Sequence, residues 1–486
     1  MDIYIAHRDV TTYPSPEAAY SPSVRYPEYP FGEPGGVDNP VYDMVRDTLH
    51  GLGLDDAHFG RPDWNPLGDI IRRNDTVLLK PNLVSHQNGA EGKGGTLDSL
   101  VTHASVLRAV TDYCLIALRG TGRIILADAP VQSCDFGTLM ERGHYRVLEQ
   151  FYRAHDVEIS FADLRSTCAV REKNGLLTQE VNKRCAFGAR VVELGADSAF
   201  AGVGEERENR LRVTNYDPAV MRAHHHGQTQ EYFISDALLM ADVVIDLPKP
   251  KTHRKAGITG CMKNFVGINA SKDYLPHHTK GYPERGGDEY PARSLSKRLN
   301  SALQEQIDIA SAHHSVSGAK FWQGVLWCKR AAFRLAGVHS SAGVSEGNWA
   351  GNDTIWRMVT DINRIVTYAD RDGVMRETPQ RRVFCLCDLI VAGENNGPLS
   401  PTDRPMGMIV AGEDRLELDR LLASLFGVDP EKIPCVAKAE YGERYALVRS
   451  HCRIRSNDPA LQADIAEEID CGDYPHAAMP PGWESV

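Results

Sequence analysis

Short apolar runs alternate with longer stretches of helical spacing along the first half of the chain. The runs 75–80 and 122–127 have the length of buried strands, whereas 41–52 and 104–118 repeat apolar residues every three or four positions, as helices do. Strands that alternate with helices predict βαβ units and a parallel sheet. The predicted strands are 2–6, 75–80, 122–127, 157–161, 243–247, 382–392 and 408–411. The predicted helices are 41–52, 104–118, 134–151, 235–240, 296–313, 321–335, 352–369 and 415–426.

Two segments interrupt this alternation. Residues from about 164 to 231 contain short strand-like runs and polar turns, which predict a small antiparallel flap. A Pro- and Gly-containing polar loop and then a mostly helical region fill 276–380. The predicted fold is therefore α/β, with two lobes that have mainly parallel sheets, the flap, a helical insertion, and a ligand cleft between the lobes. We expect an N-terminal α/β lobe over 1–275, the insertion over 276–380 and a C-terminal α/β lobe over 381–486.

Composition narrows the function classes. The 486 residues are 42% hydrophobic and 24% charged, which is typical of a globular protein. The formal net charge of -11 argues against a protein that binds nucleic acid or a membrane surface over its whole face. The first residues, MDIYIAHRDV, lack the features of an export signal, and no apolar run is long enough to span a bilayer. We therefore expect a cytoplasmic protein.

The 11 cysteines are scattered along the chain, and Cys385 and Cys387 form the one close pair. This spacing indicates neither a disulfide framework nor a zinc ribbon. The C-x-x-C spacing of ferredoxin clusters does not occur, so we expect no iron-sulfur cluster.

The stretch 235–269 holds the densest group of cations behind a predicted buried strand. After the apolar run 243–247, Pro248 and Pro250 break the strand, and a polar loop follows at the edge where open α/β proteins bind ligands. The basic residues of this loop are Lys249, Lys251, His253, Lys255 and Lys263. We interpret Lys251 and Lys255 as solvated. Lys263 has apolar neighbours and glycines around it, where an idle lysine would be costly to bury.

Other predicted strands also end in polar residues. They are Lys80 and Asn82 after the second strand, Asp128 after the third, and Glu394 and Asn396 after the strand 382–392. Asp388 lies inside that last apolar run, where a charge is costly unless it is paired. The loop 271–291 is rich in His, Lys, Asp and Tyr and is a candidate wall of the same site.

Histidines at two further places leave alternatives open. His103 precedes the helix 104–118, where the helix dipole favours a neutral imidazole that suits acid/base work, although a capping histidine is as well supported by position. The triplet 224–226 cannot readily bind one metal, because adjacent residues of an extended chain face opposite ways. A solvated loop is the favoured interpretation of the triplet, and one functional histidine is the alternative.

These residues together resemble the family catalogued as domain of unknown function 362. The resemblance rests on VLLKPNLV (77–84), Thr-His at 102–103, ILADAP (125–130), VVIDLPKPKTHRKAGITGCMKNFVGI (243–268) and GENNGP (393–398). Many members of this family carry a cysteine-rich ferredoxin segment. This chain has none, so the resemblance does not imply electron transfer here.

The central motif is also similar, more distantly, to nickel-pincer lactate racemases. Those enzymes have a histidine, then AGxSGG, a lysine ten positions after that histidine, and a further histidine. Here His253 is followed by Ala-Gly-Ile-Thr-Gly at 256–260 and by Lys263, and His277 and His278 come later. The likeness implies acid/base or metal-ligand roles for His253, His277 and His278, and a covalent nickel-pincer-like cofactor on Lys263. The chain departs from the racemase pattern at Gly-Cys-Met before Lys263 and at Lys-Pro-Asn-Leu after the early strand.

Two classes of function follow. The first is an enzyme that acts on a small anionic substrate, a carboxylate or phosphate, by isomerase-type or metal-assisted chemistry. Its catalytic candidates are His253, Lys263, His103 and Asp128, and its substrate-binding candidates are Lys80, Asn82, Lys249, Asn264, Glu394 and Asn396. The second is a carrier that holds an anionic metabolite or cofactor. We expect an enzyme to bring His253 and Asp128 within hydrogen-bond reach, whereas a carrier needs no such pair.

Overall fold

The predicted strands become neighbours in one central sheet. The computed structural model describes residues 2–171, 177–183, 185–313, 315–335, 344–469 and 476–484. Its ten-stranded sheet has the order β17-β1-β16-β15-β11-β2-β3-β4, and β12 joins β15 and β13 at one end. These strands are β1 (Ile3–His7), β2 (Thr76–Pro81), β3 (Arg123–Asp128), β4 (Ile159–Asp163), β11 (Val243–Leu247), β12 (Lys251–His253), β13 (Gly257–Thr259), β15 (Arg382–Asn396), β16 (Ser400–Gly412) and β17 (Ile454–Ser456).

The centre of the sheet is parallel, as predicted. The pairs β4–β3, β3–β2, β2–β11 and β11–β15 are parallel, whereas β15–β16 and β16–β1 are antiparallel. Successive residues of a central strand enter different cores: Leu78 packs on one side of β2, and Val77 and Leu79 pack on the other. Both faces of the sheet are therefore buried, which explains why these strands are continuous apolar runs.

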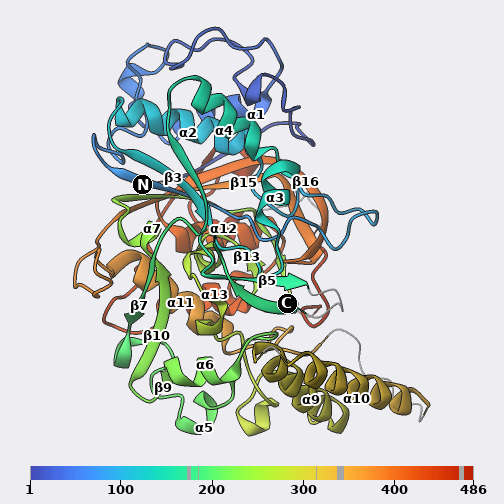
Figure 1. Ribbon diagram of the computed structural model, residues 1–486. Helices are drawn as coiled ribbons and strands as arrows, with labels where there is room; N and C mark the ends of the chain where they lie inside the picture. The colour runs from blue at the N-terminus through green and yellow to red at the C-terminus, as the bar shows by residue number, and fades with distance from the viewer. Residues whose placement is uncertain are drawn as a thin grey trace.

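Helices cover both faces of the sheet (Figure 1). The first core includes residues of α11, α12 and α8, and the second includes residues of α1, α2 and α4. The α-helices are α1 (Pro40–Gly51), α2 (Ala104–Leu118), α3 (Phe136–Arg142), α4 (Tyr145–Ala154), α5 (Glu205–Glu208), α6 (Pro218–His224), α7 (Asp236–Leu239), α8 (Cys261–Asn264), α9 (Leu295–Ala312), α10 (Val316–Leu335), α11 (Ile355–Tyr368), α12 (Arg415–Leu425) and α13 (Pro434–Ala437). None of the helices in the described ranges is long and apolar enough to cross a membrane.

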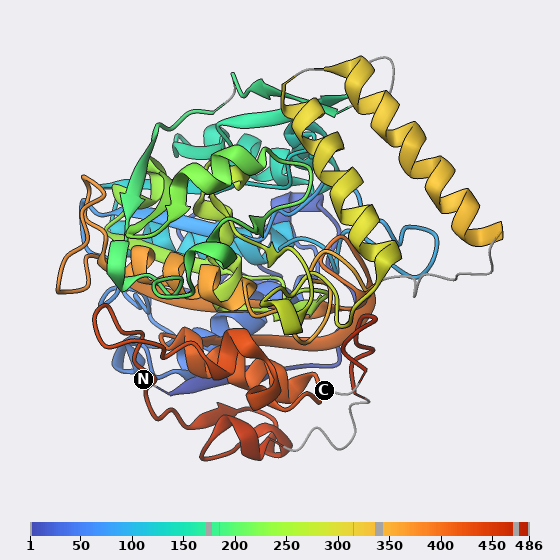
Figure 2. The same cartoon turned by 90° about the horizontal axis from the view of Figure 1, so that it is seen from below.

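The flap and the helical insertion both occur. The flap contains the antiparallel pair β5–β6 and the set β7-β10-β9, and β8 pairs with β14 from the following loop. Helices α9 and α10 form a hairpin that projects from the body of the molecule (Figure 2). The flap strands are β5 (Thr167–Arg171), β6 (Leu177–Val181), β7 (Ala189–Glu193), β8 (Leu211–Arg212), β9 (His225–His226) and β10 (Thr229–Ser235), and β14 (His278–Thr279) belongs to the following loop.

Three local predictions were wrong. The helix predicted over 134–151 is two helices, because the chain turns at Gly143 and at His144, whose φ is 59°. The segment 393–396, predicted as a turn, continues β15 into a long hairpin with β16. The flap, predicted as short strands and turns, also contains the short helix α6.

The sheet crosses the predicted lobe boundaries. Strands β15 and β16 come from the predicted C-terminal lobe, yet they lie between β1 and β11, which come from the predicted N-terminal lobe. The α/β class and the mainly parallel sheet are thus confirmed, whereas no cleft between two separate sheets is seen in the described residues. The division into 1–275, 276–380 and 381–486 stays a prediction.

Candidate functional site

A pocket of about 520 Å³ lies where several parallel strands end. Asn82 follows β2, Asp128 ends β3, and the hairpin between β15 and β16 closes one side. Residues 213–216 from the flap side complete the wall. The polar and charged lining residues are Asn82, Asp128, Gln132, Ser133, Thr214, Asn215, Tyr216, Lys251, His253, Arg254, Lys255, Thr259, Lys263, Asn264, Lys272, His277, Glu346, Asn348, Asn396 and Ser400.

Four lysines line this pocket. They are Lys251, Lys255, Lys263 and Lys272. The interpretation of Lys251 as solvated was wrong, because Lys251 is fully buried. Its strand β12 pairs with β13 on one side and with Gly393 of β15 on the other. Its ammonium donates to Asn82 Oδ1 at 2.9 Å and to the Lys249 carbonyl at 2.7 Å. Lys255, also interpreted as solvated, is half-buried and donates to the Glu346 carbonyl.

Burial lowers the pKa values of these lysines. Desolvation lowers the pKa of Lys255 to about 8 and that of Lys272 to about 7, and the nearest carboxylates, Glu346 and Asp128 respectively, partly oppose this shift. Burial lowers the pKa of Lys263 to about 8. Desolvation, with Lys249 next in effect, holds the pKa of Lys251 well below its usual range.

Lys263 lies on α8, a one-turn helix whose start is held by a neighbouring helix. The Asp419 carboxylate on α12 accepts hydrogen bonds from the amides of Cys261 and Met262 at 2.6 and 3.0 Å. No side chain of the described residues forms a hydrogen bond or ion pair with the Lys263 ammonium. Lys263 is therefore positioned by its helix and left available to a ligand.

His253 is fixed as a hydrogen-bond donor. Its Nδ1 accepts from the amides of Lys255 and Ala256 at 3.0 and 3.1 Å. Burial holds the pKa of His253 well below its usual range, so the ring is neutral and its proton lies on Nε2. An Nε2–H group can donate to a developing negative charge. It cannot act as a base or bind a metal unless Nδ1 loses its two donors.

His277 has the opposite tautomer. Its Nδ1 lies 2.7 Å from the Leu275 carbonyl, which can only accept, so Nδ1 carries the proton. Burial, followed in effect by Lys263, lowers the pKa of His277 to about 3. The lone pair is on Nε2 of a residue that lines the pocket, so Nε2 can accept a hydrogen bond or a proton from a ligand, and its lowered pKa makes it a weak base.

The Asp128 carboxylate is already bound by neighbouring protein groups. It pairs with Lys80 at 2.7 Å and accepts from the amides of Leu83 and Ala129 at 2.6 and 2.9 Å. Lys80 is fully buried and Asp128 nearly so. In the described residues no hydrogen bond joins Asp128 to His253, so the predicted acid/base pair is not formed.

A chain of amide groups connects the pocket to the sheet. Lys251 donates to Asn82, Asn82 donates to Asn264 Oδ1 at 3.0 Å, and Asn264 donates to Asp246 Oδ1 at 2.7 Å. Asp246 is the penultimate residue of β11. The two asparagines therefore fix the pocket floor against the central sheet.

With this geometry established, comparison with known proteins identifies the family. The model of a family described as a domain of unknown function, DUF362, matches residues 77–424. The chain belongs to the DUF362 family. No curated protein gives a significant match to this DUF362 protein. A crystal structure of a protein from Thermotoga maritima is similar at 11% identity with a TM-score of 0.30, over 76% of this chain and 54% of that one. The chain thus spans about half the length of that protein.

Four predicted site residues of this DUF362 protein lie elsewhere. His103 is the N-cap of α2, accepts from the Ser105 amide and stacks on Tyr13 at a separation of 3.9 Å between ring centroids. It lines another pocket, of about 220 Å³. Lys249 is fully buried and pairs with Asp388 at 2.7 Å, which provides the partner that Asp388 needed. Lys80 lies behind Asp128, and Glu394 accepts from Arg404 and from the Ala478 amide.

The histidines proposed as metal ligands do not form a group. His278 belongs to β14 and lines a different pocket from His277. In the part of the chain that the structure describes, one group of three side chains brings possible metal ligands close together. It consists of Asp246, Cys261 and Cys385 and contains no histidine. With Nδ1 of His253 already accepting two hydrogen bonds, the residues do not fit the nickel-pincer arrangement. The triplet 224–226 also lies outside the lysine pocket, and His225 is buried rather than solvated.

Sequence reasoning missed Lys272 and Tyr216 as individual pocket residues. Lys272 belongs to the loop 271–291, which was predicted to form a wall of the site. The composition of that loop was therefore the signal that could have identified Lys272. Tyr216 comes from the flap side, and no local pattern links that region to the strand ends. The pocket depends here on contacts between segments far apart in sequence.

Proposed function

We propose that this DUF362 protein is an enzyme that binds a small carboxylate or phosphate in the lysine pocket and moves a proton on it. The observation that carries the proposal is the convergence of four lysines on one pocket. The acidic lining residues are Asp128 and Glu346, and Asp128 is already paired with Lys80. One buried and three half-buried lysines without carboxylate partners in the described residues favour an anionic ligand.

The roles follow from what each group can donate or accept. Lys251, Lys255 and Lys272 would hold the anionic group, because each carries N–H donors directed by protein carbonyls. His253 would donate its Nε2–H to charge that develops on the substrate. Lys263 and His277 would exchange the proton, since Lys263 has no side-chain partner and His277 presents a lone pair. An isomerase-type reaction at a carbon beside a carboxylate is the reaction class that these roles favour.

Solvent exchange tests this proposal. The full chain is incubated with small 2-hydroxy acids in deuterated water, and proton NMR follows loss of the hydrogen on the carbon beside the carboxylate. We expect exchange with the unaltered chain and with Lys320→Met, an exposed lysine of α10. Lys263→Met should lower the rate by about 100-fold or more, since a positioned acid/base group contributes that much. Equal rates in Lys263→Met and Lys320→Met would refute the role of Lys263.

A carrier is the second candidate. The observation that favours it is the missing contact between His253 and Asp128, because a carrier needs no oriented acid/base pair. Acids that bind to the pocket without hydrogen exchange or chemical change would identify the carrier. The expected cytoplasmic location and the absence of nucleic-acid binding stay predictions under either candidate.

A further inference from the structure

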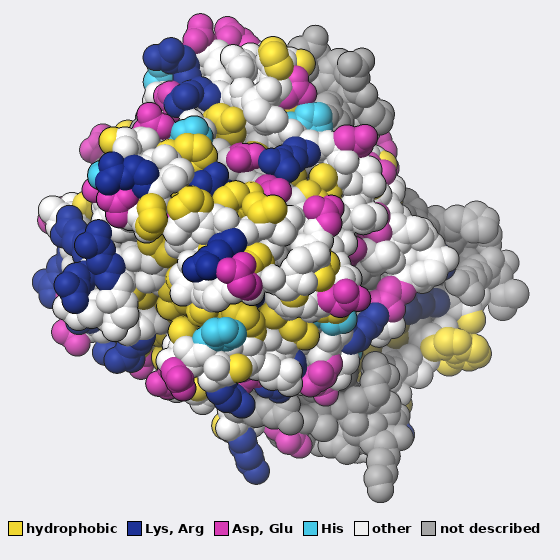
Figure 3. Space-filling view, turned by 90° about the horizontal axis from the view of Figure 1, so that it is seen from above, with side chains coloured by type: hydrophobic (Ala, Val, Ile, Leu, Met, Phe, Trp, Pro, Cys, Tyr) yellow, Lys and Arg dark blue, Asp and Glu magenta, His cyan; other side chains and the backbone are white. Residues whose placement is uncertain are grey.

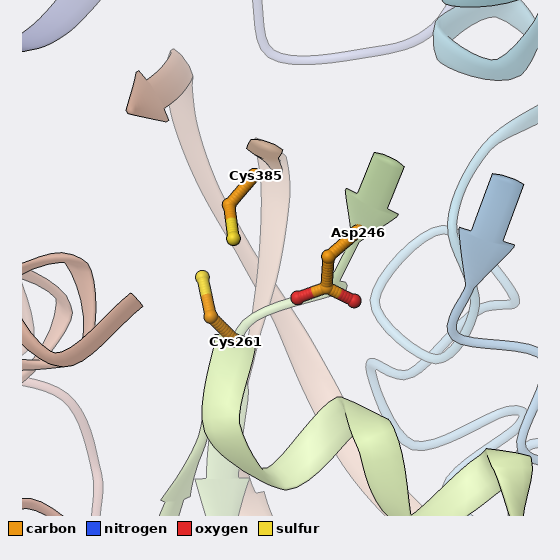
Figure 4. A group of neighbouring side chains, drawn as sticks. All are labelled: Asp246, Cys261 and Cys385. Atoms are coloured by element: carbon orange, nitrogen blue, oxygen red, sulfur yellow. The ribbon is translucent and has the colours of Figure 1, made fainter. Parts of the chain in front are cut away.

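Three buried side chains with metal-binding atoms converge beside α8. Asp246 is on β11, Cys385 is its register partner on β15, and Cys261 opens α8 (Figure 4). One carboxylate oxygen and the two sulfur atoms lie within 4.8 Å of one another, and all three residues are fully buried. Figure 4 shows the two sulfur atoms directed toward each other with the Asp246 carboxylate beside them.

A fourth donor lies next to this group. Cys387 follows Cys385 by two residues on β15, so both side chains leave the same face of the strand. The Cys387 sulfur lies 3.5 Å from the Cys261 sulfur. Two thiolates bound to one tetrahedral zinc at about 2.3 Å lie about 3.8 Å apart, so the separation between Cys261 and Cys387 suits a shared ion. Cys387 is outside the group whose donor atoms all lie within 4.8 Å of one another, so its side chain must move toward the other two donors when the ion binds.

Two neighbouring polar atoms are left without partners. Asp246 Oδ1 accepts from Asn264, but Oδ2 is buried with no hydrogen-bond partner in the described residues. The Nη1 of Arg415, whose charge acts on Cys385 and Asp246, is also buried without a partner. Unpaired buried polar atoms are uncommon and costly. A cation bound between Asp246 and the cysteines would give the Asp246 carboxylate a positively charged partner. The thiolates that bind the cation would in turn place negative charge near the Arg415 guanidinium.

We propose that Asp246, Cys261, Cys385 and Cys387 bind a structural zinc ion. Soft thiolate donors select zinc over magnesium or calcium, and a closed set of four protein ligands is typical of structural rather than catalytic zinc. The cysteines release their thiol protons when the ion binds. The ion ties β11 and β15 to α8, and α8 carries Lys263 and Asn264 at the pocket. The proposal does not depend on what the pocket binds.

Metal content tests the assignment. The full chain is purified under reducing conditions, loaded with zinc and dialysed, and its zinc is measured by mass spectrometry. We expect one zinc per chain in the unaltered protein and in Cys114→Ser, a matched change at a buried cysteine of α2 that is outside the group. Asp246→Asn and Cys261→Ser should bind zinc at least about 100-fold more weakly than the unaltered chain. Loss of a residue that only supports a zinc ligand already costs about 10–100-fold in affinity, and these variants lose a ligand itself. Circular dichroism establishes that each variant is folded.

Cobalt in place of zinc keeps the test decisive if Cys261→Ser does not fold. The unaltered chain with cobalt should show thiolate-to-cobalt charge-transfer absorption and the strong ligand-field bands of a tetrahedral site. Absence of these bands, or no stoichiometric zinc in the folded chain, would overturn the assignment. Zinc that persists in both variants, or peptide mapping that reveals a disulfide between Cys261 and Cys387, would overturn it as well.

Discussion

At the scale of single residues, the pocket depends on where protons reside. His253 and His277 are both neutral, yet backbone groups give them opposite tautomers, so one donates and the other accepts at the pocket. The lysines are buried together, which lowers the pKa of each. Binding an anion would raise these pKa values again. Anion affinity and lysine protonation are therefore coupled.

Anion affinity should fall as the pH rises. A lysine is charged below its pKa, and the pKa values of Lys272 and Lys255 are about 7 and about 8. At lower pH both are charged, whereas at higher pH each must regain a proton before it can hold an anion. We expect the affinity for acetate, which stays largely ionised, to drop at least about tenfold from about pH 6 to about pH 9.

Calorimetric titrations at several pH values measure this dependence. The neighbouring charges of Lys272 are Asp128, Lys263, Lys80 and Arg165, and none of them reverses the sign. An affinity for acetate that is constant over this range would show that these lysines do not bind the anion.

At the scale of elements, the short segment η4 (Phe265–Ile268) brings backbone against the buried ion pair. Gly267 leaves no room for a side chain: a Cβ there would lie 1.8 Å from Asp128 Oδ1 and 2.8 Å from the Lys80 ammonium. The glycine lets the Ala129 amide donate to the Gly267 carbonyl at 2.8 Å. The end of β3 and the segment after α8 are joined at this point.

Gly267→Ala should therefore destabilise the protein. The added methyl group must displace the Asp128 carboxylate from buried Lys80, which we expect to cost about 3 kcal/mol of unfolding free energy. Gly324→Ala on α10 is the matched control. No atom lies within 4 Å of a Cβ there, and alanine should stabilise the helix by about 0.5–1 kcal/mol. Urea denaturation measures both changes, and equal midpoints would contradict the close packing at Gly267.

At the scale of the whole molecule, the surface and the pocket differ in charge. Figure 3 shows acidic and basic side chains intermixed over one face, and the chain carries a formal net charge of -11. Such a net charge repels anions at long range. The proposed attraction for an anion would therefore arise within the pocket, from the lysines that strand ends and loops bring together.

Local patterns predicted the elements better than they predicted the site. The apolar runs at β2, β3 and β11 and the helices α2 and α12 follow from periodicity, which depends on neighbours in sequence. The burial of Lys251 depends on pairing with Gly393, and the position of Tyr216 depends on how the flap packs. Neither could be predicted from the residues next to it in sequence. The cations behind the predicted strand 243–247 pointed to this loop, and the spacing shared with the racemases, together with the apolar neighbours of Lys263, narrowed the candidates to His253 and Lys263. The tautomer of His253 could not be predicted from the sequence, because it depends on two backbone amides that donate to Nδ1.

Anion binding by the lysine pocket is the central claim, and calorimetry measures it most directly. Acetate and inorganic phosphate are titrated separately into the full chain, into Lys272→Met and into the surface control Lys320→Met. We predict one binding site per chain in the unaltered protein and in Lys320→Met for at least one of the two anions. Lys272→Met should bind that anion at least about tenfold more weakly, because it loses a charged hydrogen bond. No binding of either anion, or equal affinity in Lys272→Met and Lys320→Met, would contradict the claim.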